Sequence, residues 1–220
     1  MNNYKETKPI VFCNIGWCNY YFGDENDPLS SGGSYVQEHG SGNESLNFYP
    51  IILSEEGRED EETVFLGSFE TKYTHDKQNQ THIEKIVGCN ALRNDPVAED
   101  VIVVWCAKNP KGQTCVVGWY QHAFVFRSYQ VMPMDGEDGS EWERWFNVSC
   151  LYDDAVLLPP EVRKQAQWAV PRHNSKNAVP FGFGQANIWY ASEPEAQDFV
   201  KRMIYQIENY TGEDIKCAIE

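Results

Sequence analysis

The chain has 220 residues and a formal net charge of −15 at pH 7, which argues against a protein that coats the nucleic-acid backbone, because Lys and Arg supply most non-specific affinity. Its hydrophobic content of 41%, with 14% aromatic residues, is enough for a packed core, and no apolar run approaches the roughly 18 residues of a transmembrane helix. The seven cysteines form no Cys-x-x-Cys pair and the N-terminus lacks the apolar stretch of a signal peptide. We therefore expect a reduced, cytoplasmic protein that uses no membrane, metal or other cofactor.

The N-terminal part of the chain predicts a strand and then a long connection. Residues 9–17 (PIVFCNIGW) form an apolar run that ends in a Gly-Trp step, as expected of a strand. Gly23–Gly42 is polar and glycine-rich, and connections of that length are usually functional or disordered. Because it contains Glu38 and His39, it is either an ordinary surface loop or one edge of a metal or acid/base site.

Two more strands are expected before the centre of the chain, at Leu46–Leu53 and at Thr63–Tyr73. The second alternates apolar and polar residues, which is typical of a strand with one buried face. The acidic stretch between them, Glu55–Glu62, predicts a solvated loop.

The most strongly patterned stretch is a hairpin at Asp100–Arg127. Val101–Cys106 is continuously apolar and predicts a strand that is buried on both faces. The following residues, 109–112 (NPKG), favour a turn because proline presets φ while asparagine and glycine tolerate turn geometry. The chain returns through Thr114–Tyr120, with a bulge expected near Gly118.

The last third predicts a strand and two helices. Glu141–Leu151 has the composition of a strand, and the Pro159-Pro160 step favours a helix at Glu161–Trp168. The C-terminal helix is expected at about 193–210, opened by a Ser192-x-x-Glu195 capping box. We find no convincing linker, so the chain is expected to be a single α+β domain over residues 1–220, with a strongly curved, barrel-like mixed sheet and flanking helices.

The common catalytic motifs are missing from the sequence. There is no phosphate-binding GxxxxGK[ST], no GxSxG and no HExxH. One weak enzyme pattern is Asp60 with Glu70 and Lys72, because two carboxylates and a lysine can bind magnesium and hydrolyse phosphodiesters. Such spacing also arises by chance, and Asp60 lies in an acidic stretch.

Aromatic residues and amides form a more suggestive pattern. Tryptophans and tyrosines fall at strand ends or beside glycine-containing turns, with amide side chains next to them. A planar base can be held between aromatic faces while an amide pairs with its edge; the alternative is a tryptophan-rich core. The candidate base-binding residues are Asn14, Trp17, Trp105, Trp119, Tyr120, Gln185, Asn187 and Trp189.

Four segments together resemble one family of domains. They are residues 14–23 (NIGWCNYYFG), residues 32–48 from GGSY to NF, residues 103–127 from VVWCA through VGWY to Arg127, and residues 157–190 from LLP through Arg163 to GQANIWY. They resemble a domain attached to HNH and other restriction-type nucleases, which is similar to the PUA superfamily with its EVE, YTH and ASCH groups.

The resemblance implies a small β-barrel with flanking helices that reads a modified or flipped base. Trp17, Trp105 and Trp119 would form an aromatic cage, and Asn14 or Gln185 would pair with the base edge. The phosphate contacts would come from Arg127, Arg163 and Arg172, joined by Lys176 in the same acid-poor stretch.

This chain departs from the family pattern, since it has no HNH motif, no second domain and a strongly acidic composition. The sequence therefore predicts a non-enzymatic module that binds nucleic acid with a modified base, with DNA favoured over RNA, and that works with a separate nuclease subunit. Two alternatives remain: a metal-dependent nuclease of restriction type, and an acidic protein-interaction or DNA-mimic protein.

Overall fold

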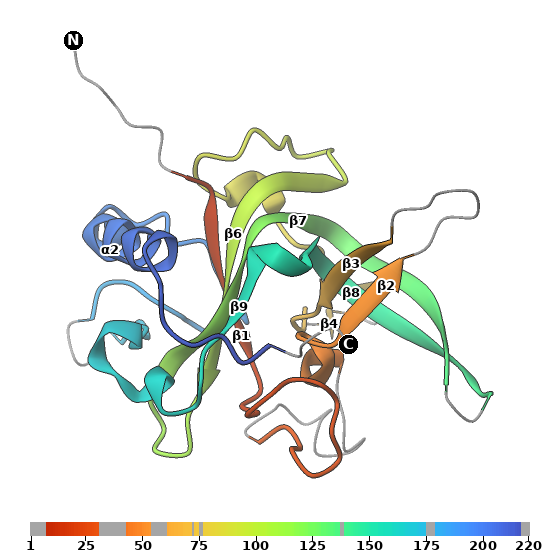
Figure 1. Ribbon diagram of the computed structural model, residues 1–220. Helices are drawn as coiled ribbons and strands as arrows, with labels where there is room; N and C mark the ends of the chain where they lie inside the picture. Colours follow the sequence, from red (N-terminus) through yellow and green to blue (C-terminus); the bar gives the residue numbers. More distant parts are fainter. Residues whose placement is uncertain are drawn as a thin grey trace.

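The computed structural model describes residues 8–30, 43–53, 61–71, 73–74, 77–136, 139–174 and 179–216. In these residues the chain forms a mixed sheet of eight strands, a separate two-stranded pair and one α-helix (Figure 1). The predicted α+β class is therefore confirmed. The strands are β1 (Ile10–Ile15), β2 (Pro50–Leu53), β3 (Glu62–Gly67), β4 (Tyr73–Thr74), β5 (Lys77–Gln78), β6 (Val97–Lys108), β7 (Thr114–Asp135), β8 (Glu141–Leu151), β9 (Ala155–Leu157) and β10 (Ile188–Trp189).

The helical elements are mostly short. Only α2 (Gln197–Glu208) is an α-helix in the described part of the chain, and none of the helices there is long and apolar enough to span a membrane. The others are 3-10 helices: η1 (Asn43–Leu46), η2 (Ile83–Lys85), η3 (Tyr152–Asp154), η4 (Val162–Lys164), η5 (Ala166–Trp168) and η7 (Pro194–Ala196).

The large sheet has the strand order β10-β1-β6-β7-β8-β3-β2, and β9 pairs with β7 outside this path. β1 runs parallel to β6, whereas the other pairs are antiparallel. Its two end strands, β10 and β2, do not pair with each other in the described residues. The sheet is therefore open there, and the predicted barrel closure is not observed.

The predicted hairpin is confirmed as β6 and β7. The register slips between Trp105 and Cys106, opposite Gly118 and Val116, which is the expected bulge. A Cβ on Gly118 would lie 2.4 Å from the carbonyl oxygen of Val156. This close approach of β9 explains why glycine stands at that position.

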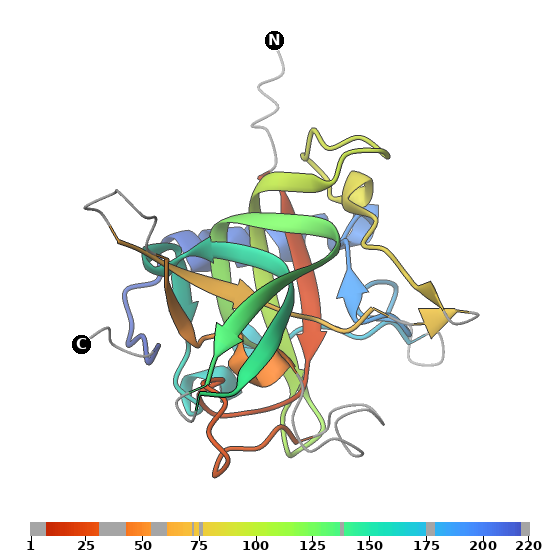
Figure 2. The ribbon, with the colours of Figure 1, turned by 90° about the vertical axis from the view of Figure 1, so that its right-hand side faces the viewer.

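β7 is the longest strand and links two parts of the sheet. It pairs with β6 as far as Phe126 and with β8 from Phe124 to Asp135, and it arches over the core between these two parts (Figures 1 and 2). The β6–β7 register shifts around Asp100, which has a positive φ of 57°, and His122 on β7 has a φ of 48°. The His122 Nδ1 and Asp100 Oδ1 atoms lie 2.7 Å apart, so a side-chain hydrogen bond joins the two irregular positions of the bend.

The sheet separates two hydrophobic cores. Val104 pairs with Trp119, and the next residue, Trp105, pairs with Gly118. Because neighbouring residues of a strand point to opposite faces, the two tryptophans lie on opposite sides. Trp105 packs in the core enclosed by the curved sheet, and Trp119 packs in the core covered by α2.

Three local predictions are corrected. Leu46 belongs to η1, so the second strand is shorter than expected and begins at Pro50. Glu161–Trp168 is not an α-helix but two 3-10 turns, because Gln165 between them is extended (φ −69°, ψ 142°). The expected Ser192–Glu195 capping box makes no side-chain cap; α2 follows η7 directly.

Candidate functional site

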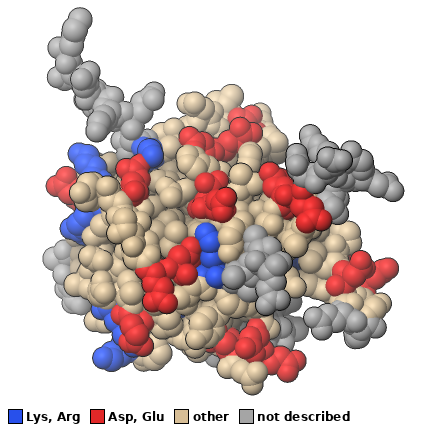
Figure 3. Space-filling model, viewed as in Figure 1, with Lys and Arg blue, Asp and Glu red and all other residues tan. Residues whose placement is uncertain are grey.

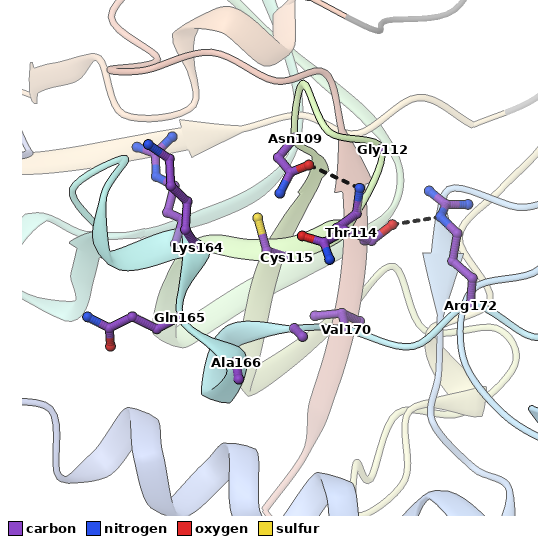
Figure 4. Close-up of a pocket in the computed structure, with 12 residues that line it drawn as sticks. Asn109, Gly112, Thr114, Cys115, Lys164, Gln165, Ala166, Val170 and Arg172 are labelled. Carbon is purple, nitrogen blue, oxygen red and sulfur yellow. Dashed lines mark hydrogen bonds between the residues drawn. The ribbon is translucent and has the colours of Figure 1, made fainter.

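A cavity of about 480 Å³ lies between the tip of the β6–β7 hairpin and the segment that contains η4 and η5. Figure 4 shows Lys164 and Arg172 on opposite sides, with Cys115 and Thr114 between them. We call it the cationic cavity. Its described lining consists of Asn109, Gly112, Gln113, Thr114, Cys115, Arg163, Lys164, Gln165, Ala166, Ala169, Val170 and Arg172.

The hairpin tip that forms one wall is fixed by its own turn chemistry. The Asn109 side-chain oxygen accepts the backbone N–H groups of Lys111 and Gln113, both at 3.0 Å. The Gly112 N–H donates to the Asn109 carbonyl at 2.8 Å, and Gly112 has a φ of +84°. These are the roles that the NPKG pattern predicts, so this wall is preorganised by local sequence.

The opposite wall is held in place by Arg163. Its Nε donates to the Leu158 carbonyl at 2.7 Å, and its two terminal nitrogens donate to the carbonyls of Cys18 and Asn19 at 2.7 and 2.5 Å. Its guanidinium carbon also lies 5.3 Å from the centre of the Trp17 ring. The side chain is fully buried, and burial lowers the pKa of its guanidinium.

The loop that offers these carbonyls is closed by Asp27. The Asp27 carboxylate accepts the backbone N–H groups of Asn19 and Tyr20 at 2.8 and 2.7 Å. The Cys18 thiol also donates to it, at 2.9 Å. This part of the predicted Gly23–Gly42 connection is therefore structured, whereas Glu38 and His39 lie outside the described residues.

The cavity is positively charged in an acidic chain. Lys164 and Arg172 are both exposed, and none of the twelve described lining residues carries a carboxylate. Lys164 does pair with one carboxylate outside the lining, Glu161, at 2.7 Å. On the face shown in Figure 3, acidic side chains are spread widely, and basic ones gather mainly on the side of α2. The cavity is thus a local exception to a net charge of −15.

Arg172 connects the cavity to a row of amides. Its Nε donates to the Thr114 hydroxyl at 2.7 Å, and one terminal nitrogen donates to the Asn14 side-chain oxygen at 2.8 Å. The Asn14 amide nitrogen lies 3.4 Å from the side-chain oxygen of Asn187. The Asn187 amide nitrogen lies 3.4 Å from the Glu70 carboxylate. The long distances of the last two contacts mark weak hydrogen bonds.

Glu44 closes this polar row. Its carboxylate accepts the N–H of Gly16 at 2.8 Å and that of Glu70 at 3.1 Å, which joins the ends of β1 and β3. Burial, and to a smaller extent the Glu70 charge, raises the pKa of the Glu44 carboxyl to about 7. This group therefore titrates near neutral pH.

Most of the candidate aromatic residues are packed in the cores. Trp105, Trp119 and Tyr120 have no exposed surface. The Tyr120 hydroxyl donates to the Asn47 carbonyl, and the Trp119 ring stacks on Trp168 with centroids 5.4 Å apart. In the described structure these residues are part of the hydrophobic cores.

The other two tryptophans are also covered. Trp189 is 5% exposed; its indole N–H donates to the Glu193 carboxylate at 3.0 Å. Trp17 is 7% exposed and packs against Arg163. The structure therefore does not gather the predicted cage of Trp17, Trp105 and Trp119.

The amide candidates are better placed. Asn14 and Asn187 are half-buried neighbours at the rim beside Arg172, and Gln185 is exposed nearby in sequence. Three lining residues were not among the binding-site candidates from the sequence: Asn109, Gln113 and Gln165. The sequence marked these positions only indirectly: Asn109 and Gln113 lie at the predicted turn, and Gln165 lies in the acid-poor stretch.

The four predicted phosphate contacts separate into different roles. Arg127 is committed to other protein groups, because it donates to the Glu84 carboxylate at 2.8 Å and to the carbonyls of Asp95 and Leu92 at 2.7 and 2.8 Å. Arg163 is buried. Arg172 is exposed at the cavity, and Lys176 lies outside the described residues.

Of the three residues predicted for a nuclease site, the structure describes the side chain of one, Glu70. Asp60 and Lys72 lie outside the residues whose side chains are described, and Glu70 is exposed beside Asn187. No group of three His, Cys, Asp or Glu side chains arranged for a metal ion occurs in the described part of the chain. Cys115 does line the cavity, but burial raises the pKa of its thiol to about 11, so it is a neutral, unreactive group.

Comparisons with protein-family models, with curated proteins and with solved structures find no match to this chain. The resemblance to PUA-like domains therefore stays a prediction.

Proposed function

We propose that this chain is a non-enzymatic binding protein for nucleic acid, and that the cationic cavity takes a single nucleotide of that ligand. The observation that carries the proposal is the charge contrast: two exposed cations and no carboxylate line the cavity, although the chain has a net charge of −15. Phosphate groups are bound by such clusters of Lys and Arg. The acidic remainder of the surface would keep non-specific binding weak.

The size and polarity of the cavity support a nucleotide. Its volume of about 480 Å³ falls within the range of about 300–1,000 Å³ that is usual for small-molecule sites. Gln113 offers an acceptor and two donors to a base edge. Gln165 offers its two donors, since its side-chain oxygen accepts from the Gln167 amide at 3.1 Å. None of the twelve described lining residues is aromatic, so in this proposal amides take the role that the sequence assigned to tryptophans.

Recognition of a modified base, in DNA more readily than in RNA, is the finer part of the proposal. It rests on the family resemblance and on the amides of the lining and the rim. Asn14 and Asn187 lie beyond Arg172, where a flanking nucleotide would pass if the phosphate is held by that arginine. A separate nuclease subunit would supply any cleavage.

We also propose that the curved sheet corresponds to the PUA-like barrel, opened between β10 and β2. The support is the arch of β7 over the enclosed core (Figure 2). An experimental structure should then superpose on PUA-like domains over β1, β6, β7 and β8 with the same strand order. A different strand order in those domains would contradict the relationship.

The phosphate part is tested by the salt dependence of oligonucleotide binding. Labelled single- and double-stranded oligonucleotides are titrated with the wild-type chain and with the double variant Lys164→Gln/Arg172→Gln. We expect weaker binding and a log–log salt slope lower by about 1–2, since each lost phosphate contact removes about 0.7–0.9 from the slope.

The matched control is Lys201→Gln/Arg202→Gln, which removes the same charge from the exposed surface of α2. An equal loss of binding in this control would show that only net charge matters and would contradict the assignment to the cavity.

Gln113→Ala with methylated and unmodified oligonucleotides tests the base-reading part. If the wild type binds both oligonucleotides equally, the proposal of base recognition is contradicted, whereas the proposal of phosphate binding is unaffected.

A further inference from the structure

The far end of β7 forms a two-stranded ribbon with β8. We call Gln130–Asp135 together with Glu141–Phe146 the acidic ribbon. These residues pair only with each other among the described strands, because β6 ends its pairing with β7 at Phe126 and β3 pairs with β8 only from Val148 onward. In Figure 1 the ribbon extends away from the body of the sheet.

The two faces of the acidic ribbon differ. One face carries Met132, Arg144 and Phe146, which pack toward the protein. Arg144 is 1% exposed and donates to the carbonyls of Asn43 and Leu66, both at 2.5 Å. These contacts fasten the ribbon to η1 and β3, so it is a fixed platform rather than a free arm.

The opposite, outer face exposes a large apolar pair. Val131 and Trp145 lie directly across from each other and are 43% and 41% exposed. Pro133, the next residue of β7 on this face, is also exposed. Packing in a core does not explain a solvent-exposed tryptophan opposite an exposed valine. Tryptophan is among the residues that are enriched at interface hot spots.

Three carboxylates follow this apolar pair on the same face, toward the tip of the ribbon. Glu143 lies opposite Pro133, and Asp135 lies opposite Glu141; all three acidic side chains are exposed. The Glu143 carboxylate accepts the indole N–H of Trp145 at 3.1 Å, which holds the ring in place. The one arginine of the ribbon is Arg144, and it is directed to the inner face.

We propose that the outer face of the acidic ribbon docks a segment of a partner protein that carries apolar and basic residues in alternation. The exposed ring and valine would receive the apolar side chains, and the three carboxylates would pair with Lys or Arg. Charge complementarity selects this occupant, because an acidic or nucleic-acid ligand would meet only like charge on this face. The surface lies at the other end of β7 from the cationic cavity, so the inference is independent of the proposed function.

The test is calorimetric titration of the full chain with a short alternating Lys-Leu peptide and with an alternating Glu-Leu peptide. We expect binding of the basic peptide alone, weakening as salt is raised. Trp145→Ala should reduce the affinity by about tenfold or more, as for a central interface tryptophan. Tyr205→Ala, which removes a 67% exposed aromatic ring from α2, should leave it unchanged.

Charge reversal separates this face from the general acidity of the chain. Glu141→Lys/Glu143→Lys should abolish binding, whereas Glu25→Lys/Glu99→Lys, which makes the same change in net charge at other exposed sites, should reduce it only slightly. Equal effects of the two pairs, an unchanged affinity of Trp145→Ala, or no binding of the basic peptide to the wild type would each overturn the proposal.

Discussion

The two ends of β7 differ in charge and in packing although they belong to one strand. The beginning, at Thr114 and Cys115, forms the floor of a cavity with two exposed cations. The end, at Asp135, belongs to a ribbon whose outer face carries three carboxylates next to an exposed tryptophan. The net charge of −15 therefore agrees with the ribbon but not with the cavity, and our two proposals assign a different ligand to each end of the strand.

Two arginines at the cationic end should differ most in their contribution to stability. Arg163→Ala should lower the free energy of unfolding by about 3–5 kcal/mol, because three carbonyls lose a charged hydrogen-bond donor in a buried site. Arg172→Ala should cost less, about 0.5–1.5 kcal/mol, because it loses only two side-chain hydrogen bonds, to Thr114 and Asn14, and it should weaken oligonucleotide binding. Urea unfolding of both variants measures this; similar losses of stability would erase the distinction between a structural and a ligand-binding arginine.

A smaller effect tests the packing of the first half of β7. Gly118→Ala should destabilise the protein by about 1–3 kcal/mol, because the new methyl group would lie 2.4 Å from a backbone oxygen of β9 and 2.7 Å from the Phe48 ring. Gly184→Ala is the control, since its Cβ would meet nothing within 4 Å. Thermal unfolding of the two variants should therefore differ by several degrees; equal midpoints would show that β9 is free to move away.

A pH-dependent effect is expected at Glu44, in the polar row beside the cationic cavity. The folded-state pKa of Glu44 is about 7 against an ordinary value of 4.5. Between these two pH values the folded protein therefore keeps a proton that the unfolded chain has released. This contribution to stability is complete below about pH 4.5 and is lost as the pH rises to about 7. Glu44→Gln should remove it.

The measurement is the difference in unfolding free energy between Glu44→Gln and the wild type across pH 4.5–7.5. The variant should gain stability relative to the wild type as the pH rises through this window. A flat difference would mean that the Glu44 carboxylate is solvated and not enclosed between Gly16 and Glu70.

The sequence predicted the features that depend on neighbours in the chain. The apolar run at Val101–Cys106, the turn at 109–112 and the bulge at Gly118 follow from local composition, and all three are observed. The α-helix near the C-terminus was also predicted, although its Ser192–Glu195 capping box was wrong because α2 follows the 3-10 helix η7 directly.

Features that depend on distant partners were not predictable. Arg163 bonds to carbonyls 144 and 145 positions earlier in the chain, and no local pattern marks it as buried. Trp105 and Trp119 face opposite cores because of the exact register between β6 and β7. The contact of Arg172 with Asn14 spans 158 positions, so the cavity rim became visible only in the fold.

The most direct test of two separate surfaces is a crossed binding measurement. Arg172→Gln and Trp145→Ala are each titrated with a labelled oligonucleotide and with the alternating Lys-Leu peptide. We expect Arg172→Gln to weaken oligonucleotide binding and to keep peptide binding, and Trp145→Ala to weaken peptide binding and to keep oligonucleotide binding. Loss of both ligands in the same variant, or of neither ligand in either variant, would contradict this expectation.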